Sequence, residues 1–284
     1  MIAPLPDLLI NPIILAALAE DLGRAGDVTA SACIAPEARL SVAYRARQDG
    51  RLAGLDCARL AIAALDASAS FVSEIADGEA IKAGQTLARA EGCARAILSA
   101  ERVGLNLLGR LSGIASLTAQ YVAAIEGTGA KITCTRKTTP GLRILEKYAV
   151  RCGGAINHRF GLDDAILIKD NHVAACGGVG KALERARAYA GHLMKIEVEI
   201  DRLDQLDEAL AHGPDVIMLD NFSLSDLVTA VARAKGQVVL EASGGVNLAT
   251  VRAIAETGVD VISVGALTHS APVLDIGLDA LDEG

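Results

Sequence analysis

The chain has 284 residues, of which 51% are hydrophobic, 22% charged and only 2% aromatic, with no tryptophan. This length and composition predict one large or two ordinary domains with a core of Ala, Val, Ile and Leu. The formal net charge of -8 argues against a general nucleic-acid or anionic-membrane partner.

The chain also lacks the marks of export or membrane insertion. No charge-free segment approaches the ~20 apolar residues of a membrane span, and no basic stretch precedes an apolar run at the N-terminus, so we expect no signal peptide. The six cysteines form no C-x-x-C pair. We therefore expect a cytoplasmic protein with reduced thiols.

The first hundred residues predict a helix followed by a β-rich region. Asn11 followed by Pro12 is typical of a helix start, with the helix running to Glu20. Residues 39–93 alternate as strands do around a short helix at 55–65. Residues 77–92 resemble the hairpin of a lipoyl or biotinyl carrier. Lys82 lacks the neighbours of a modified lysine, so we interpret this region as scaffold.

Residues 94–126 predict the longest helix, because leucines and isoleucines recur at three- and four-residue spacing. Gly104, Gly109 and Gly113 each cost about 1 kcal/mol of helix stability relative to alanine. Glycines are tolerated in a helix where another backbone packs closely. The helix, which includes Arg102, is therefore a candidate for a domain or subunit contact.

From Lys131 onward, short apolar runs alternate with helical patterns, and each run stops at polar residues or glycines. Glu199, Asp220 and Glu241 follow three successive runs at intervals of 21 residues. Such a period predicts repeated strand-helix units in a (β/α) barrel or a doubly wound open sheet. We favour the barrel because every strand ends in polar residues or glycines, and not only the strands beside one switch point. The runs are 132–134, 165–168, 196–198, 216–219, 238–240 and 261–264.

Positive charge is concentrated in one part of this acidic chain. Residues 131–160 contain seven Lys or Arg and a single Glu, a net charge of +6. A solvated basic face would explain such a window if its cations did not follow strands and glycine turns. We interpret it as the binding site of a small anionic ligand.

The strand ends together would bring complementary groups to one edge of the barrel. Several cations imply a ligand with more than one negative group. Two glycine-rich turns suit a phosphate. The carboxylates of Glu199 and Asp220 can either bind Mg²⁺ or hydrogen-bond sugar hydroxyls and stabilise developing positive charge. The cations are Arg136, Lys137, His158, Arg159 and Lys169, and the turns are Ser243-Gly244-Gly245 and Gly265-Ala266.

Long motifs in this order resemble the quinolinate phosphoribosyltransferases, and the resemblance covers nearly the whole chain. It implies an N-terminal α/β domain that is rich in strands and an open, incomplete (β/α) barrel. It also implies a homodimer whose subunits share active sites. The motifs are EDLGRAGDVT (20–29), ERVGLNLLGRLSGIAS (101–116), TRKTTPGLR (135–143), GGAINHRFGLDDAILIKDNH (153–172), EVE (197–199), LDN (219–221), EASGG (241–245) and SVGALTHS (263–270).

The family's reaction, as the resemblance implies it, joins quinolinate to the anomeric carbon of phosphoribosyl pyrophosphate with Mg²⁺. Pyrophosphate leaves, CO₂ is lost, and nicotinate mononucleotide forms on the way to NAD. We expect catalysis by positioning and electrostatics, without a covalent enzyme intermediate.

The resemblance also assigns roles by position. Arg136, His158, Arg159 and Lys169 would bind the quinolinate carboxylates, joined by Arg102 of the partner subunit. Lys137 would face the pyrophosphate, and Glu199 and Asp220 would hold the ribose hydroxyls and Mg²⁺. The expected catalytic residues are Lys137, Lys169, Glu199 and Asp220. The other expected substrate-binding residues are Thr135 and the 5′-phosphate cradle of Ser243, Gly244, Gly245, Ser263, Val264 and Gly265.

The expected domains are residues 1–115 and the barrel at 116–270, with a tail at 271–284 packing on the first domain. Four alternatives stay open at this point. One is a molybdenum-transport-associated paralogue with another acceptor, and another is a nicotinate phosphoribosyltransferase. The others are a Schiff-base aldolase that uses Lys169 and a non-catalytic carrier built on residues 77–92.

Overall fold

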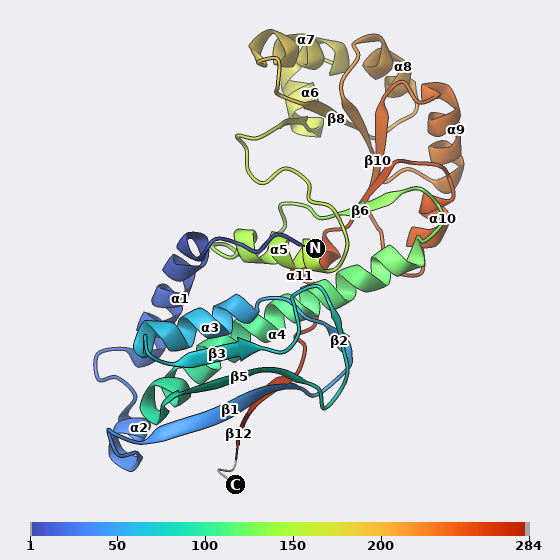
Figure 1. The fold of residues 1–284 in the computed structure, drawn as a ribbon. Coiled ribbons are helices and arrows are strands. Elements are labelled where there is room, and N and C mark those ends of the chain that lie inside the picture. The colour runs from blue at the N-terminus through green and yellow to red at the C-terminus, as the bar shows by residue number, and fades with distance from the viewer. Residues whose placement is uncertain (1, 282–284) are drawn as a thin grey trace. The chain divides into compact units, whose positions relative to one another are not determined.

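The computed structural model describes residues 2–281, and its contacts divide the chain into two compact units (Figure 1). The first unit comprises the residues up to Ala119, Thr138–Gly154 and the residues from Ser270 onward. The second comprises Gln120–Lys137 and Ala155–His269. Residues 282–284 of the expected tail lie outside the described residues.

The first unit is built around a four-stranded antiparallel sheet in the order β12-β1-β5-β3. The β-rich character expected for this region is confirmed. Its elements are α1 (Asp7–Leu22), α2 (Val28–Cys33), β1 (Arg39–Ala46), β2 (Gly50–Arg51), α3 (Leu55–Leu65), β3 (Ser70–Ser73), β4 (Ala80–Ile81), β5 (Thr86–Cys93), most of α4 (Ala94–Ala124), α5 (Arg143–Cys152) and β12 (Ile276–Ala280).

The predicted start of the first helix at Asn11 is wrong, because α1 begins at Asp7 and has Pro12 inside it. Ile10, Ile14 and Leu18 are buried at four-residue spacing, so an earlier start places Ile10 in the core. Pro12 lies in the second turn, where its missing N–H removes one intrahelical bond. Burial of the apolar stripe stabilises the helix by more than the lost hydrogen bond at Pro12 costs.

The glycines of α4 face backbone from elsewhere in the same unit, as expected for glycines inside a helix. A methyl group on Gly113 would lie 1.9 Å from the carbonyl oxygen of Pro272, and one on Gly109 would lie 2.8 Å from that of Leu274. One on Gly104 would lie 3.3 Å from the Cα of Ala58. These three glycines therefore admit segments of the same chain, and they are not evidence for a subunit interface.

The second unit alternates strands and helices. Its strands are β6 (Lys131–Thr133), β7 (Ile166–Ile168), β8 (Ile196–Ile200), β9 (Val216–Asp220), β10 (Val239–Ser243) and β11 (Val261–Ser263). Its helices are α6 (Asp170–Cys176), α7 (Val179–Tyr189), α8 (Asp204–Ala211), α9 (Leu224–Ala234), α10 (Val251–Ala255) and α11 (Ala266–His269).

The six strands form one parallel sheet in the order β6-β11-β10-β9-β8-β7. Beyond β6, Ile156 makes a parallel bridge to Thr133, so the segment after α5 continues the sheet by one residue pair. Among residues 2–281, no ladder joins this segment to β7. The sheet is an open, incomplete barrel, as expected.

Three strands extend further than their apolar runs indicated. The structure includes Glu199 in β8, Asp220 in β9, and Glu241 with Ser243 in β10, where the sequence suggested that the strands stop before them. Glu199 and Glu241 both pair with Met218 of β9, and Asp220 pairs with Ser243. Ladder hydrogen bonds with neighbouring parallel strands thus hold these polar residues in strand conformation. These four polar side chains therefore point to the same face of the sheet.

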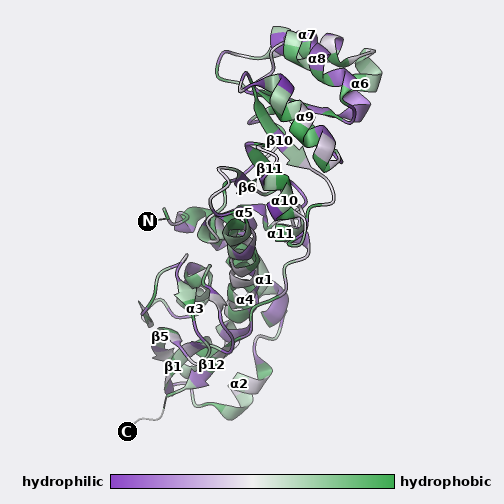
Figure 2. Cartoon of the chain, turned by 90° about the vertical axis from the view of Figure 1, so that its right-hand side faces the viewer, coloured by the Kyte–Doolittle hydropathy of each residue, from purple (hydrophilic) through white to green (hydrophobic). Residues whose placement is uncertain are grey.

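Helices α7, α8 and α9 contain both hydrophobic and hydrophilic residues (Figure 2) and bury part of their apolar residues. In α9, the side chain of Ser223 accepts a hydrogen bond from the N–H of Asp226, and Leu227, Ala230 and Ala234 are buried. Helix α7 packs against β7 and β8 in the same way. Among residues 2–281, no helix combines the length and the sustained hydropathy that a bilayer-spanning segment needs.

Candidate active site

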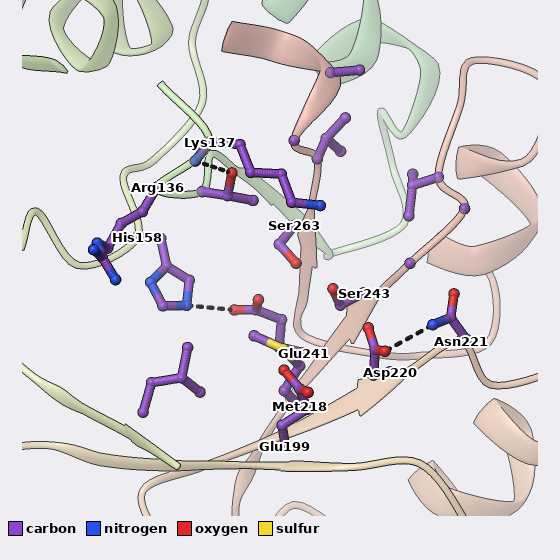
Figure 3. A pocket seen from close by; sticks show the side chains of 18 of the residues that line it. Arg136, Lys137, His158, Glu199, Met218, Asp220, Asn221, Glu241, Ser243 and Ser263 are labelled. Carbon is purple, nitrogen blue, oxygen red and sulfur yellow. Dashed lines mark hydrogen bonds and ion pairs between the residues drawn. The ribbon is translucent and has the colours of Figure 1, made fainter. Parts of the chain in front are cut away.

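A cavity of about 710 Å³ opens at the carboxyl ends of the barrel strands (Figure 3). Every residue expected at the site lines it, except Arg102. The lining residues are Thr135, Arg136, Lys137, His158, Arg159, Leu167, Lys169, Glu199, Met218, Asp220, Asn221, Glu241, Ser243, Gly244, Gly245, Val246, Ser263, Val264, Gly265, Ala266 and His269.

Strand register explains which carboxylates reach the cavity. Glu199, Met218 and Glu241 lie opposite one another on β8, β9 and β10, and all three line the cavity. Glu197 has the same side-chain direction as Glu199 because side chains alternate along a strand. It lies two residues earlier and does not line the cavity. The carboxylate of Glu197 therefore lies one layer of side chains beneath that of Glu199, which lines the cavity.

Lys169 and Glu199 form an ion pair between the end of β7 and β8. The Lys169 side chain is 46% exposed and that of Glu199 only 11% exposed. The backbone N–H of Lys169 donates to Nδ1 of His172 at 2.9 Å. Lys169 therefore presents a cation at the cavity. Glu199 holds its ammonium group, and His172 accepts its backbone N–H.

His158 contacts both buried glutamates. Its Nε2 lies 3.0 Å from Oε2 of Glu197 and 3.8 Å from Oε2 of Glu241, and its Nδ1 accepts the backbone N–H of Arg159 at 2.8 Å. Figure 3 shows the ring pointing toward the Glu241 carboxylate. Burial first, and then repulsion from Glu197, raise the pKa of Glu241 to about 7, whereas His158 acts in the opposite direction.

Arg136 and Arg159 bring two guanidinium groups to the same part of the cavity. Burial, followed by the nearby Arg136, lowers the pKa of Arg159. Nη1 of Arg159 donates to the carbonyl oxygen of Ala165 at 3.1 Å, but its buried Nε has no hydrogen-bond partner among the described residues. A buried donor without a partner costs free energy, so this corner is suited to an added anion.

The opposite part of the cavity is formed by tight turns. Asn221 has φ 56° and donates from Nδ2 to Oδ2 of Asp220 at 2.7 Å. Gly244 has φ 90°, and a methyl group there would lie 2.1 Å from Oδ1 of Asn221. Gly245, with φ 62°, has open space where its Cβ would be. Bare backbone amides at such turns bind phosphate oxygens well.

Lys137 lies between these two parts. Its backbone N–H donates to Oγ1 of Thr135 at 3.0 Å, and its carbonyl accepts from Oγ1 of Thr268 at 2.8 Å. A methyl group on Gly265 would lie 3.1 Å from Cδ of Lys137. The absence of a side chain at Gly265 therefore leaves room for the lysine stem beside the turn.

Arg102 lies on α4 in the first unit, with its side chain 64% exposed. Its nearest carboxylate is that of Glu101, at 3.9 Å. Arg102 is not among the residues that line the cavity of the second unit.

Several cavity residues were not predicted from the sequence. Glu241 and Asn221 belong to motifs quoted above and follow apolar runs, yet neither was assigned a role. His269 ends α11, the short helix after β11, and was not considered. The spacing of Glu197 and Glu199 did carry a signal, since residues two apart in a strand face the same side.

Comparisons with known proteins cover most of the chain. Residues 27–112 match the family described as quinolinate phosphoribosyl transferase, N-terminal domain, and residues 114–279 match the corresponding C-terminal domain. A probable carboxylating nicotinate-nucleotide pyrophosphorylase of Bacillus subtilis is 46% identical over 92% of this chain and 89% of its own length. The carboxylating nicotinate-nucleotide pyrophosphorylase of Mycobacterium leprae is 46% identical over 93% of this chain and 94% of its own.

Solved structures agree with these sequence matches. The crystal structure of NadC from Streptococcus pyogenes matches with a TM-score of 0.94 and 41% identity, covering 99% of this chain and 100% of that one. The nicotinate-nucleotide pyrophosphorylase from Francisella tularensis matches with a TM-score of 0.94 and 39% identity, covering 99% of each chain.

Proposed function

The chain belongs to the quinolinate phosphoribosyltransferase family, and from that premise we propose how its cavity performs the family's reaction. The enzyme transfers the phosphoribosyl group of phosphoribosyl pyrophosphate to quinolinate with decarboxylation, in de novo NAD biosynthesis. The products are nicotinate mononucleotide, pyrophosphate and CO₂. The observation that supports this activity in the chain itself is the meeting of cations, carboxylates and glycine turns in one cavity.

The two quinolinate carboxylates bind at the cationic side of the cavity, between Arg136, Arg159 and Lys169. Guanidinium groups bind carboxylates with two parallel hydrogen bonds, and the unpartnered Nε of Arg159 supplies one such donor. This placement directs the ring nitrogen toward the sugar. A monocarboxylate such as nicotinate leaves one cationic position without its anion.

The 5′-phosphate binds at the turns of Ser243–Gly245 and Ser263–Gly265. The support is steric, because the left-handed Gly244 and the side-chain-free Gly265 expose backbone N–H groups where other residues would clash. Lys137 lies next to Gly265 and faces the pyrophosphate. These contacts fix the anomeric carbon for in-line attack.

Glu199 and Asp220 act on the ribose. As the ring nitrogen bonds to the anomeric carbon and the bond to pyrophosphate breaks, positive charge develops on the sugar, and two carboxylates stabilise it. The nitrogen of the resulting adduct is positively charged. Its ring accepts the electron pair released when the bond to CO₂ breaks, and a proton replaces CO₂.

Mg²⁺ fits the same two carboxylates. It is usually bound through one or two carboxylates together with substrate phosphates, and both Glu199 and Asp220 line the cavity with oxygen donors. When bound, the ion neutralises charge on the departing pyrophosphate. His158, Glu197 and Glu241 also bring ligand atoms within 4.8 Å of one another. A histidine nitrogen that donates to Glu197 is protonated, however, and does not bind metal in that state.

Arg102 completes the quinolinate end of a second subunit's cavity in a homodimer. Its side chain is 64% exposed on α4 and is therefore accessible to a partner subunit, which supports a role in trans. The six cysteines are free thiols, which supports a cytoplasmic location. Lys169 is a cation paired with Glu199 and not the neutral amine that a Schiff-base aldolase requires.

The test is an incubation of the purified chain with quinolinate, phosphoribosyl pyrophosphate and Mg²⁺. We expect CO₂ and nicotinate mononucleotide in equal amounts. With nicotinate as the control acceptor, we expect little nucleotide. Equal use of both acceptors, or nucleotide without CO₂, would contradict the proposed function.

A further inference from the structure

The buried carboxylate of Glu197 has no part in the roles proposed so far. It is 7% exposed, does not line the cavity, and its Oε2 lies 3.0 Å from Nε2 of His158. The charge of a carboxylate is costly to bury, and the contact with His158 is its closest ion pair among the described residues. Its position therefore points to a task connected with that ring.

Both ring nitrogens of His158 are engaged in the substrate-free cavity. Nδ1 accepts the backbone N–H of Arg159, which requires that Nδ1 carry no proton. Nε2 faces Glu197 and donates its proton there. Glu197 thus determines which nitrogen is protonated, and the ring links β8 to the backbone of Arg159.

Arg159 is the residue that benefits from this link. Its guanidinium is anchored to the carbonyl of Ala165 by one nitrogen and has a buried donor without a partner among the described residues. Repulsion from the nearby Arg136 favours movement of the Arg159 side chain away from Arg136. A backbone held through His158 opposes that movement before substrate arrives, which reduces the ordering cost of binding.

We propose that Glu197 is a positioning residue for the quinolinate half of the cavity, acting through the ring of His158 on the backbone of Arg159. Glu241, 3.8 Å from the same ring nitrogen, is the second carboxylate of this buried group. The proposal rests on the proposed role of Arg159 in binding quinolinate. If the wild-type enzyme failed to use quinolinate, the proposed function would be wrong. If the wild-type enzyme used quinolinate normally and Glu197 variants did too, only this inference would be wrong.

The first experiment compares Glu197→Leu with Glu197→Gln. Leucine removes the acceptor at similar volume, so KM for quinolinate should rise about tenfold or more, with KM for phosphoribosyl pyrophosphate unchanged. Glutamine retains an oxygen that accepts from Nε2, so it should restore KM for quinolinate to within about threefold of wild type. A merely structural role would raise both KM values together, and that result would overturn the proposal.

Two further measurements test whether Glu197 acts through His158. In the His158→Asn background, Glu197→Leu should change KM for quinolinate no further. If the two residues acted independently, their fold-changes in KM would multiply. The chain has five histidines, so ¹⁵N-histidine spectra can be assigned with His158→Asn. The Nε2–H tautomer of His158 should dominate in wild type and in Glu197→Gln. This measurement does not require the leucine variant to fold. An Nδ1–H tautomer in wild type would refute the mechanism.

Discussion

Gly244 provides a sharp test of the ribose side of the cavity. Replacement by alanine would place a methyl group 2.1 Å from Oδ1 and 2.6 Å from Cγ of Asn221, with the backbone nitrogen of Asn221 at 3.0 Å. The side chain of Asn221 must rotate away, which breaks its 2.7 Å hydrogen bond to Asp220. The φ of 90° adds backbone strain on the order of 1–3 kcal/mol to the folded state.

The catalytic loss follows from the broken hydrogen bond. A hydrogen bond to a charged group contributes about 1.5–3 kcal/mol, so kcat/KM for phosphoribosyl pyrophosphate should fall roughly 10- to 100-fold. The assay varies phosphoribosyl pyrophosphate at saturating quinolinate. Asn221→Gly removes the same hydrogen bond and keeps the left-handed φ of 56° without strain, so it should show a similar loss.

The double variant then identifies the cause. With Asn221→Gly already present, Gly244→Ala meets no amide oxygen and should lower kcat/KM little further. Gly213→Ala is the control for strain alone, since φ is 57°, no atom lies within 4 Å of its Cβ and the residue does not line the cavity. It should cost about 1 kcal/mol of stability and leave Asp220 held. Losses that multiply in the double variant would refute the steric argument.

Other residues give independent predictions. Lys169→Ala should lower kcat about 100-fold or more with the fold intact by circular dichroism, and turnover near that of wild type would exclude its role. The pKa of Glu241 is raised to about 7, so the unfolded state loses this proton first and stability falls as pH rises from about 4.5 to 7, on the order of 3 kcal/mol. Denaturation of Glu241→Gln should show a flatter pH profile, and an unchanged slope would contradict the burial argument. Gly113→Ala should destabilise by about 1–3 kcal/mol despite better helix propensity, whereas Gly104→Ala, 3.3 Å from its neighbour, should be near neutral; equal effects would be inconsistent with the close approach at Gly113. Mixing inactive Arg102→Ala and Lys169→Ala subunits should restore about a quarter of wild-type activity, because hybrid dimers contain one intact site, and no recovery would exclude a shared site.

The barrel and its cavity were largely predictable from sequence because each strand-helix unit carries its own signals. Apolar runs at a regular period predicted the strands, and polar residues at their ends predicted which side chains would meet. Glu199 and Asp220 were found in this way. The residue-by-residue roles came from the family resemblance, since spacing alone left the two uses of the carboxylates open.

What the sequence did not reveal depends on tertiary contacts. The start of α1 was misplaced because Pro12 gave a strong local signal, while the burial of Ile10 depends on packing across the unit. Glu197 was overlooked because its importance comes from a histidine 39 positions earlier, brought beside it by the segment that bridges to β6. The glycines of α4 predicted a close backbone but not which one.

The central claim is that Arg136, Arg159 and Lys169 together bind a doubly acidic pyridine beside the sugar phosphate. A crystal structure of the enzyme with quinolinate tests it most directly. We predict both carboxylates within about 3 Å of nitrogen atoms of these three side chains, with the ring nitrogen toward Glu199 and Asp220. Quinolinate bound outside this cavity, or with its carboxylates at the Gly244 turn, would contradict the claim.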